Sequence, residues 1–355
     1  MEYRSLGRTG IKVSRLGLGA MMLGAWGNTD LAACRRIVDR ALDAGINLVD
    51  TADVYAAGQN EKIVGEAIRS RRNEVVLCTK FHNPVGESTD PNSRGNSRRW
   101  IIQAVDDSLR RLGTEWIDVY QAHRPDPATD IDETVDALND LLRAGKIRAW
   151  GTSTFPAEHL VEAHWSAHRR GVTGPHTEQA PYSILCRGIE RDVLPTARRY
   201  GMGVLTWSPL SGGWLTGKYT RDDPRPEGTR AFTHPDHFDG QNPAKFDAVA
   251  ALAEVAAEAG ISMTHMALAW NVEHPGVTTA LLGPRTEAQL ADLLSAADLQ
   301  LSPDVLDAID RVVAPGANVN PADVDWTPSG LDVAHRRRTR NGAGTGRYGL
   351  TVRPQ

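Results

Sequence analysis

Four residues of types that transfer protons lie at or just beyond the ends of apolar runs in this sequence. Asp50 and Lys80 each end such a run, His123 lies just beyond a third, and Tyr55 follows Asp50 in the next loop. A tyrosine hydroxyl, with a pKa near 10, is a poor acid at neutral pH until a neighbouring ammonium stabilises its phenolate. Lys80 would supply that charge, Asp50 would hold Lys80, and His123 would orient a carbonyl oxygen or relay the proton. Together these residues predict a proton-transfer site.

Each of these residues also has a simpler explanation when taken alone. An Asp at the end of a strand is often a helix or turn cap, and a single Lys or Tyr is usually a solvated surface residue. The two interpretations differ in whether the fold brings the strand ends together.

The elements that must position these residues are short apolar runs alternating with segments of helical period. That alternation is typical of repeated βα units and a parallel sheet. In the unit before Asp50, Thr29 or Asp30 caps a helix that Gly45 ends. Eight strands are predicted: Arg15–Leu18, Asn47–Asp50, Val75–Lys80, Ile117–Gln121, Ile147–Thr152, Thr177–Gln179, Gly203–Trp207 and Thr278–Leu282.

Eight such units predict an α/β fold, a single (β/α)₈ TIM barrel over residues 1–313 with a C-terminal extension at 314–355. Residues 81–97 and 208–243 form long loops at the C-terminal ends of strands, where barrel enzymes build their sites. An open dinucleotide-binding sheet is disfavoured, since no GxGxxG opens a helix and Gly17 and Gly19 are followed by Ala and two Met.

Composition narrows the class of protein further. The chain has 355 residues, 41% of them hydrophobic, and its 40 basic and 44 acidic residues give a net charge of −4. We therefore expect neither a nucleic-acid nor a membrane partner. Three scattered cysteines and the absence of a long apolar run favour a cytoplasmic protein with free thiols. Six Arg stand against one Asp in residues 331–355, which we interpret as part of a solvated extension or an arm over the site.

Five motifs in order resemble those of the aldo-keto reductase family. The run GINLVDTADVY at 45–55, with NEKIVG at 60–65, resembles the signature around that family's catalytic Asp and Tyr. Further matches are CTK at 78–80, DVYQAH at 118–123, and GPR at 283–285 with QL at 289–290. The resemblance covers roughly residues 3–313, and the opening residues 6–19 are similar to the bacterial and channel-subunit-like branches.

The resemblance implies a role for each matching residue. Tyr55 would be the general acid, completed by Asp50, Lys80 and His123, while NADPH delivers hydride to a carbonyl carbon. Arg285 matches the residue that pairs with the 2′-phosphate, which favours NADP(H) because a guanidinium suits a phosphate dianion. The other implied cofactor contacts are Ser153, Gln179, Trp207, Ser208, Leu210, Gly212, Lys218, Gly283, Gln289 and Asp292.

Two positions depart from the family's pattern. Thr154 and Asp292 stand where the family usually has Asn, so the geometry at the nicotinamide and the preference between cofactors stay open. We also expect Trp26 to line the substrate pocket.

The function that these expectations favour is reduction of an aldehyde or ketone by NADPH, by direct hydride transfer without a metal. The alternative is a nicotinamide-binding subunit that reports redox state to a partner with little turnover, as the channel-associated relatives imply. The physiological carbonyl substrate, the direction of the reaction and the oligomeric state, including a homo-oligomer, stay open at this point because specificity lies in the loops.

Overall fold

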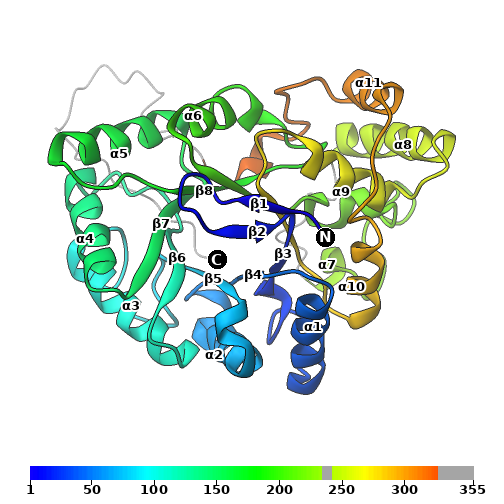
Figure 1. Cartoon of the computed structure of the whole chain (residues 1–355). Helices are drawn as coiled ribbons and strands as arrows, with labels where there is room; N and C mark the ends of the chain where they lie inside the picture. Colours follow the sequence, from blue (N-terminus) through cyan, green and yellow to red (C-terminus); the bar gives the residue numbers. More distant parts are fainter. Residues whose placement is uncertain (234–241, 327–355) are drawn as a thin grey trace, which may run out of the picture.

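The computed structural model describes residues 1–233 and 242–326, and its centre is a closed barrel of parallel strands ringed by helices (Figure 1). Neighbouring strands follow the order β10-β3-β4-β5-β6-β7-β8-β9. The barrel strands are β3 (Leu16–Gly19), β4 (Leu48–Asp50), β5 (Val76–Phe81), β6 (Ile117–Ala122), β7 (Ile147–Ser153), β8 (Thr177–Pro181), β9 (Gly203–Trp207) and β10 (Thr279–Leu282). The predicted (β/α)₈ barrel is therefore confirmed, with every strand close to its expected bounds.

Helices follow the strands and cover the outside of the barrel. They are α1 (Leu31–Asp43), α2 (Gln59–Ile68), α3 (Arg98–Leu112), α4 (Ile131–Arg143), α5 (Ala157–Arg170), α6 (Val193–Tyr200), α7 (Arg230–Thr233), α8 (Pro243–Glu258), α9 (Met263–Glu273), α10 (Glu287–Leu294) and α11 (Pro303–Val312). Asp30 caps α1 by accepting hydrogen bonds from the amides of Ala32 and Ala33, as the sequence suggested.

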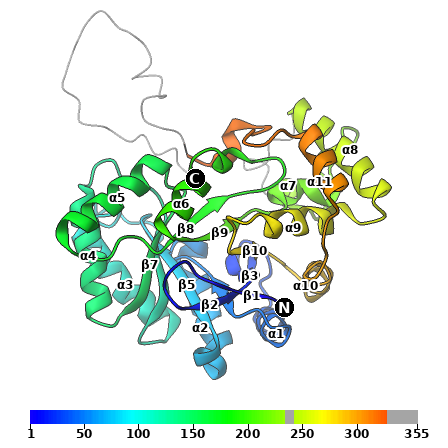
Figure 2. The ribbon, with the colours of Figure 1, turned by 45° about the horizontal axis from the view of Figure 1, so that its top comes forward.

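A hairpin at the N-terminus, which the sequence did not predict, closes one end of the barrel. β1 (Tyr3–Ser5) pairs antiparallel with β2 (Lys12–Ser14) and lies across the strands in both views (Figures 1 and 2). Its Leu6 and Val13 are fully buried in a cluster with residues from inside the barrel. The two strands have three residues each, too short to show an alternation that sequence reasoning could use.

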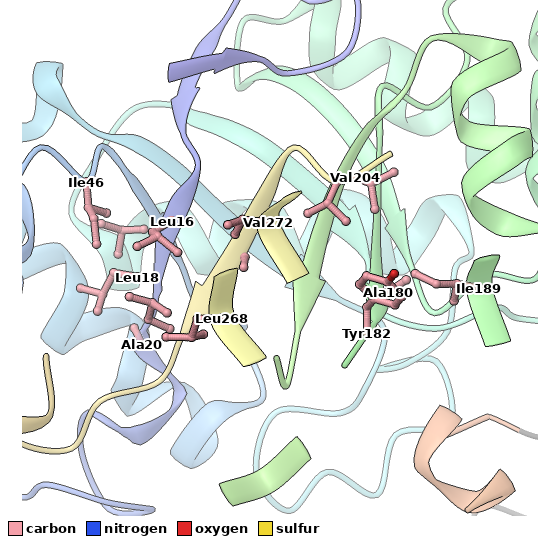
Figure 3. Packing of buried hydrophobic residues seen from close by; sticks show 14 of the residues in the cluster. Leu16, Leu18, Ala20, Ile46, Ala180, Tyr182, Ile189, Val204, Leu268 and Val272 are labelled. Carbon is pink, nitrogen blue, oxygen red and sulfur yellow. The ribbon is translucent and has the colours of Figure 1, made fainter. Parts of the chain in front are cut away.

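Helix α9 was also missed, and its burial explains why. Most of its residues are buried, so it lacks the polar face that gives a surface helix its apolar period. Leu268 and Val272 of α9 belong to the large cluster that also contains Leu16 and Leu18 of β3 (Figure 3). This cluster fills the layer between the barrel and its helices.

Alternate side chains along each strand point into the barrel. They fill its interior and, farther along the strands, line its open end, which we call the mouth. Leu48, Cys78 and Val119 point inward, in one cluster with Ala149 and Leu205. Because side chains two residues apart share a face, the same parity brings later residues of each strand to the open end of the barrel. These are the polar positions Asp50, Lys80, Gln121, Ser153 and Trp207.

The chain beyond α11 packs on the barrel as far as the structure describes it. Gly188 donates its amide to the Asn318 side chain, and Val319 donates its amide to the Leu185 carbonyl. This places the orange segment after α11 beside the loop that follows β8 (Figure 2). The basic stretch 331–355 lies outside the described residues.

None of the helices within residues 1–233 and 242–326 is both long and apolar enough to cross a membrane.

One buried carboxyl group in the barrel wall has an unusual pKa. Glu178 of β8 is fully buried, and burial raises its pKa from 4.5 to about 8. The Thr152 hydroxyl lies 2.5 Å from one oxygen and the Phe155 amide donates to the other at 3.1 Å. Glu178 is therefore a neutral acid at pH 7 in the folded protein.

We predict that the wild-type protein loses stability as the pH rises and that the Glu178→Gln variant does not show this loss. The unfolded chain releases this proton near pH 4.5 and the folded protein only near pH 8, so wild type is destabilised across that window. Each pKa unit corresponds to about 1.36 kcal/mol, which gives an effect of a few kcal/mol. Denaturant midpoints at pH 5 and pH 8.5 measure it, with the exposed Glu258→Gln as control. Parallel curves for wild type and Glu178→Gln would contradict the assignment.

Candidate active site

A buried ion pair lies at the base of the mouth. Lys80 is completely buried, and its Nζ donates to Asp50 Oδ2 at 2.7 Å and to the Thr51 carbonyl at 2.8 Å. The other Asp50 oxygen accepts from Gln179 Nε2 at 2.8 Å. Burial raises the pKa of Asp50 although Lys80 acts to lower it. Burial acts to lower the pKa of Lys80, but the charge and hydrogen bond of Asp50 act against burial, and the pKa of Lys80 is raised. The ammonium is therefore held in a fixed place.

Tyr55 stands over this ammonium on the loop after β4. The Lys80 Nζ lies 5.3 Å from the centroid of the Tyr55 ring. The sequence led us to expect a lowered pKa, and Lys80 does act in that direction. Burial has the larger effect, so the pKa of Tyr55 lies above its ordinary value of 10. At neutral pH, Tyr55 is a protonated phenol with a cation beside it.

His123 completes the set of four that the sequence singled out. Its ring lies edge-on to Tyr55, with the centroids 5.9 Å apart. Burial, with the charges of Arg124 and Lys80, holds the pKa of His123 well below its usual 6.5, so the imidazole is neutral. Trp26 lies on another side of Tyr55, 5.7 Å between ring centroids. The barrel thus brings Asp50, Lys80, Tyr55 and His123 together, with Trp26 beside them.

Three of the residues that the resemblance assigns to the cofactor lie at or near the ends of neighbouring strands. Ser153 ends β7, Gln179 lies on β8, and Trp207 ends β9. The Ser153 hydroxyl donates to the Gln179 carbonyl at 2.9 Å, and the Gln179 amide nitrogen, besides reaching Asp50, lies 3.2 Å from Gln121 Oε1. Gln179 therefore connects the ion pair to this side of the mouth.

Thr154 adopts a backbone conformation that a β-branched residue rarely takes. Its φ is 60°, in the left-handed region. Its amide donates to the Gln179 carbonyl at 2.9 Å, and its hydroxyl accepts from Arg124 at 3.1 Å. Backbone strain of this kind costs on the order of 1–3 kcal/mol and persists where neighbouring contacts impose it.

The loop after β9 exposes backbone at a sharp turn. Ser208, Ser211, Gly212 and Gly213 all have positive φ, and Leu210 precedes the short 3₁₀ turn η5 (Ser211–Thr216). A Cβ built at Gly212 would meet nothing within 4 Å, which leaves this backbone open to a ligand.

Three cations gather beside this turn. Lys218 lies against Gly213, where a Cβ would meet its Nζ at 2.9 Å. Burial and then the charge of Arg285 lower the pKa of Lys218, and Arg285 also acts to lower the pKa of Arg230. Arg285 donates to the Gly228 carbonyl at 3.1 Å. Within residues 1–233 and 242–326, none of these three cations has a carboxylate at salt-bridge distance, so the cluster suits an anionic ligand such as a phosphate.

The remaining predicted contacts surround Arg285. Gly283 is open to solvent, with nothing within 4 Å of a Cβ built there. Gln289 of α10 accepts the Arg285 amide at 2.8 Å. Asp292 pairs with His265, whose Nε2 lies 3.0 Å from Oδ1. The Asp292 side chain, which stands where the family usually has Asn, thus has His265 as its partner.

Three residues of the mouth were missed in the sequence. Gln121 lies on the inner face of β6, two residues after Val119 and two before His123, so the strand period would have identified it. Arg124 follows His123 directly, and this position in the sequence was the only sign that it belongs to the site. Arg230 begins the four-residue helix α7, which interrupts the long connection after β9, and no sequence pattern brings it to Arg285.

No group of three or more His, Cys, Asp and Glu residues in the described part of the chain is arranged to hold a metal ion.

Comparison with known proteins gives a consistent picture. The model of the aldo/keto reductase family matches residues 15–314. A probable voltage-gated potassium channel subunit beta of Oryza sativa subsp. japonica is 37% identical over 325 residues, which cover 88% of this chain and 97% of that protein.

Two proteins of Bacillus subtilis are similarly related. The uncharacterized oxidoreductase YrpG is 38% identical over 335 residues, covering 92% of this chain and 100% of that protein. The aldo-keto reductase YhdN is 38% identical over 301 residues, covering 82% and 88%. With a family match across most of the barrel and relatives of this identity over nearly their full length, the chain belongs to the aldo/keto reductase family.

Proposed function

We propose that this oxidoreductase reduces an aldehyde or ketone with NADPH, using Tyr55 as the general acid. The observation that carries the proposal is the protonated Tyr55 phenol above an ammonium that Asp50 and the Thr51 carbonyl fix in place. A phenol releases a proton to a developing alkoxide when a neighbouring cation stabilises the phenolate. The site has this arrangement, and it is next to the strand ends that suit a nicotinamide.

The chain's own residues account for the acid–base part of the reaction. Tyr55 transfers its proton to the carbonyl oxygen, Lys80 stabilises the phenolate that remains, and water restores the proton. Neutral His123 orients the carbonyl oxygen by a hydrogen bond. NADPH, when held by these residues, would supply the hydride for the carbonyl carbon, so that the products would be an alcohol and NADP⁺.

The cofactor assignment is supported by the distribution of charge. The open turn at Gly212 and the cluster of Lys218, Arg230 and Arg285 suit the phosphates of a dinucleotide. Arg285 would bind the additional 2′-phosphate, which distinguishes NADP(H) from NAD(H). Trp207 and Ser153, at the other end of the site, would face the nicotinamide.

A second candidate function follows from the names of the relatives. The rice protein described above is named as a probable channel subunit beta, and a putative one of Schizosaccharomyces pombe is 35% identical over 339 residues. A nicotinamide-binding subunit that reports redox state would need the cofactor site but no turnover. The complete set of Asp50, Tyr55, Lys80 and His123 favours the enzyme.

We predict that Tyr55→Phe abolishes carbonyl reduction but not cofactor binding. The variant keeps the ring and loses only the hydroxyl that donates the proton, and positioned acids contribute roughly 10²–10⁴-fold to a rate. NADPH oxidation followed by absorbance, with a panel of small aldehydes and quinones, measures the loss, and fluorescence titration with NADPH is the control. Equal turnover in the variant would exclude Tyr55 as the acid. Tight NADPH binding by wild type without turnover of any carbonyl would support the subunit.

We predict that Arg285→Ala weakens binding of NADPH far more than binding of NADH. A hydrogen bond to a charged group contributes about 1.5–3 kcal/mol, so NADPH affinity should fall roughly 10- to 100-fold. Dissociation constants for both nucleotides, measured by fluorescence, give the comparison. Arg36→Ala, an exposed arginine that pairs with Glu287, is a matched control. Equal losses for the two nucleotides would refute the 2′-phosphate assignment.

A further inference from the structure

One cation at the mouth neither donates the proton nor belongs to the cluster of Lys218, Arg230 and Arg285. Arg124 follows His123 at the end of β6, and its Nη1 donates to the His123 carbonyl at 2.8 Å and to the Thr154 hydroxyl at 3.1 Å. These two contacts fix the guanidinium between the ends of β6 and β7. Residues at the ends of two barrel strands therefore hold the guanidinium in position.

The Arg124 charge acts on the reacting groups. It acts to lower the pKa of both Tyr55 and His123, although burial keeps the pKa of Tyr55 above its ordinary value, so the guanidinium lies within electrostatic reach of the hydroxyl that delivers the proton. His123 itself is neutral and Lys80 is completely buried beneath Tyr55. Arg124, with about a quarter of its side chain exposed, is consequently the cation that a substrate beside His123 can reach.

The carboxylate that Arg124 binds comes from outside the barrel. Its Nη2 contacts one oxygen of Asp325, which follows the short turn η7 (Pro321–Val324) in the segment after α11. The Asp325 side chain is 60% exposed, and the segment is anchored elsewhere, by Asp323 and Lys245 at 2.8 Å. An exposed ion pair of this kind contributes about 0–1 kcal/mol, so another carboxylate can replace it.

We propose that the carbonyl substrate carries a carboxylate and that Arg124 binds this group in place of Asp325. Nη1 is occupied by the barrel, which leaves Nη2 and Nε for a carboxylate, and a guanidinium binds carboxylates more tightly than any neutral side chain does. The cluster of Lys218, Arg230 and Arg285 lies beside the loop after β9, and we assign it to the cofactor, although the charges of Arg230 and Tyr55 also act on each other. The substrate class is thus an oxo acid, and this assignment rests on the proposed carbonyl reduction.

The test compares 4-oxobutanoate with its methyl ester, which has the same reacting aldehyde without the charge. With NADPH and full-length protein, we expect kcat/KM for the acid to exceed that for the ester, by roughly 10- to 100-fold for a charge-assisted hydrogen bond. Arg124→Gln should remove the preference, chiefly by raising KM for the acid. The ester reports any structural damage in that variant, and Arg110→Gln, an exposed arginine on α3 that pairs with Asp107, controls for the loss of one positive charge.

Asp325→Asn separates exchange of carboxylates from a purely structural role of the Arg124 pair. If Asp325 competes with the substrate, the variant should increase the acid-to-ester ratio of kcat/KM several-fold. A fall in that ratio, or no preference for the acid in wild type, would overturn the proposal.

A binding measurement distinguishes this proposal from the proposed reaction. Butanoate should bind the complex with NADP⁺ in calorimetry, and Arg124→Gln should abolish the binding. Butanoate binding that depends on Arg124, without turnover of either aldehyde, would retain the anion site and reject the reductase. Turnover of both aldehydes at equal kcat/KM would retain the reductase and reject the anion site.

Discussion

The rest of the site depends on the buried ion pair between Lys80 and Asp50. An ammonium removed from water is costly unless its hydrogen bonds are satisfied, and Lys80 has Asp50 and the Thr51 carbonyl as acceptors. The pair joins β4 to β5, and Gln179 extends the connection to β8. Since breaking such a pair leaves an uncompensated charge, about 3–5 kcal/mol opposes any displacement of Lys80 from beneath Tyr55. The barrel thus fixes one charge and arranges the neutral groups around it.

Strand parity explains how a packed barrel can carry a polar mouth. Leu48, Cys78 and Val119 seal the interior, with Leu6 and Val13 of the N-terminal hairpin beneath them. Each strand then places its next inward residue one level higher, where water and ligand can enter. The apolar layer excludes water from below the ion pair, which strengthens the electrostatic effect of Lys80 on Tyr55.

The extent to which the sequence predicted this structure follows from the same physics. The eight barrel strands and the residues at their ends have short-range patterns, and their convergence follows from closing a parallel sheet. Helix α9 has no polar face, and the hairpin strands have only three residues each. Neither therefore shows a hydrophobic period in the sequence. Arg230 and Asp325 reach the site through irregular segments, whose paths depend on tertiary contacts. The raised pKa of Tyr55 depends on burial, which only the fold determines.

The charge on the proposed substrate affects how readily Tyr55 gives up its proton. When Tyr55 gives up its proton, a negative charge forms on a buried oxygen, and Lys80, with a smaller effect of Arg124, must oppose the effect of burial. A substrate carboxylate beside His123 would add a second negative charge and make proton transfer harder. Arg124 bound to that carboxylate cancels most of this field, because the pair is nearly neutral at the distance of the phenolate. One guanidinium would therefore serve both to select an anionic substrate and to keep its charge from opposing the reaction.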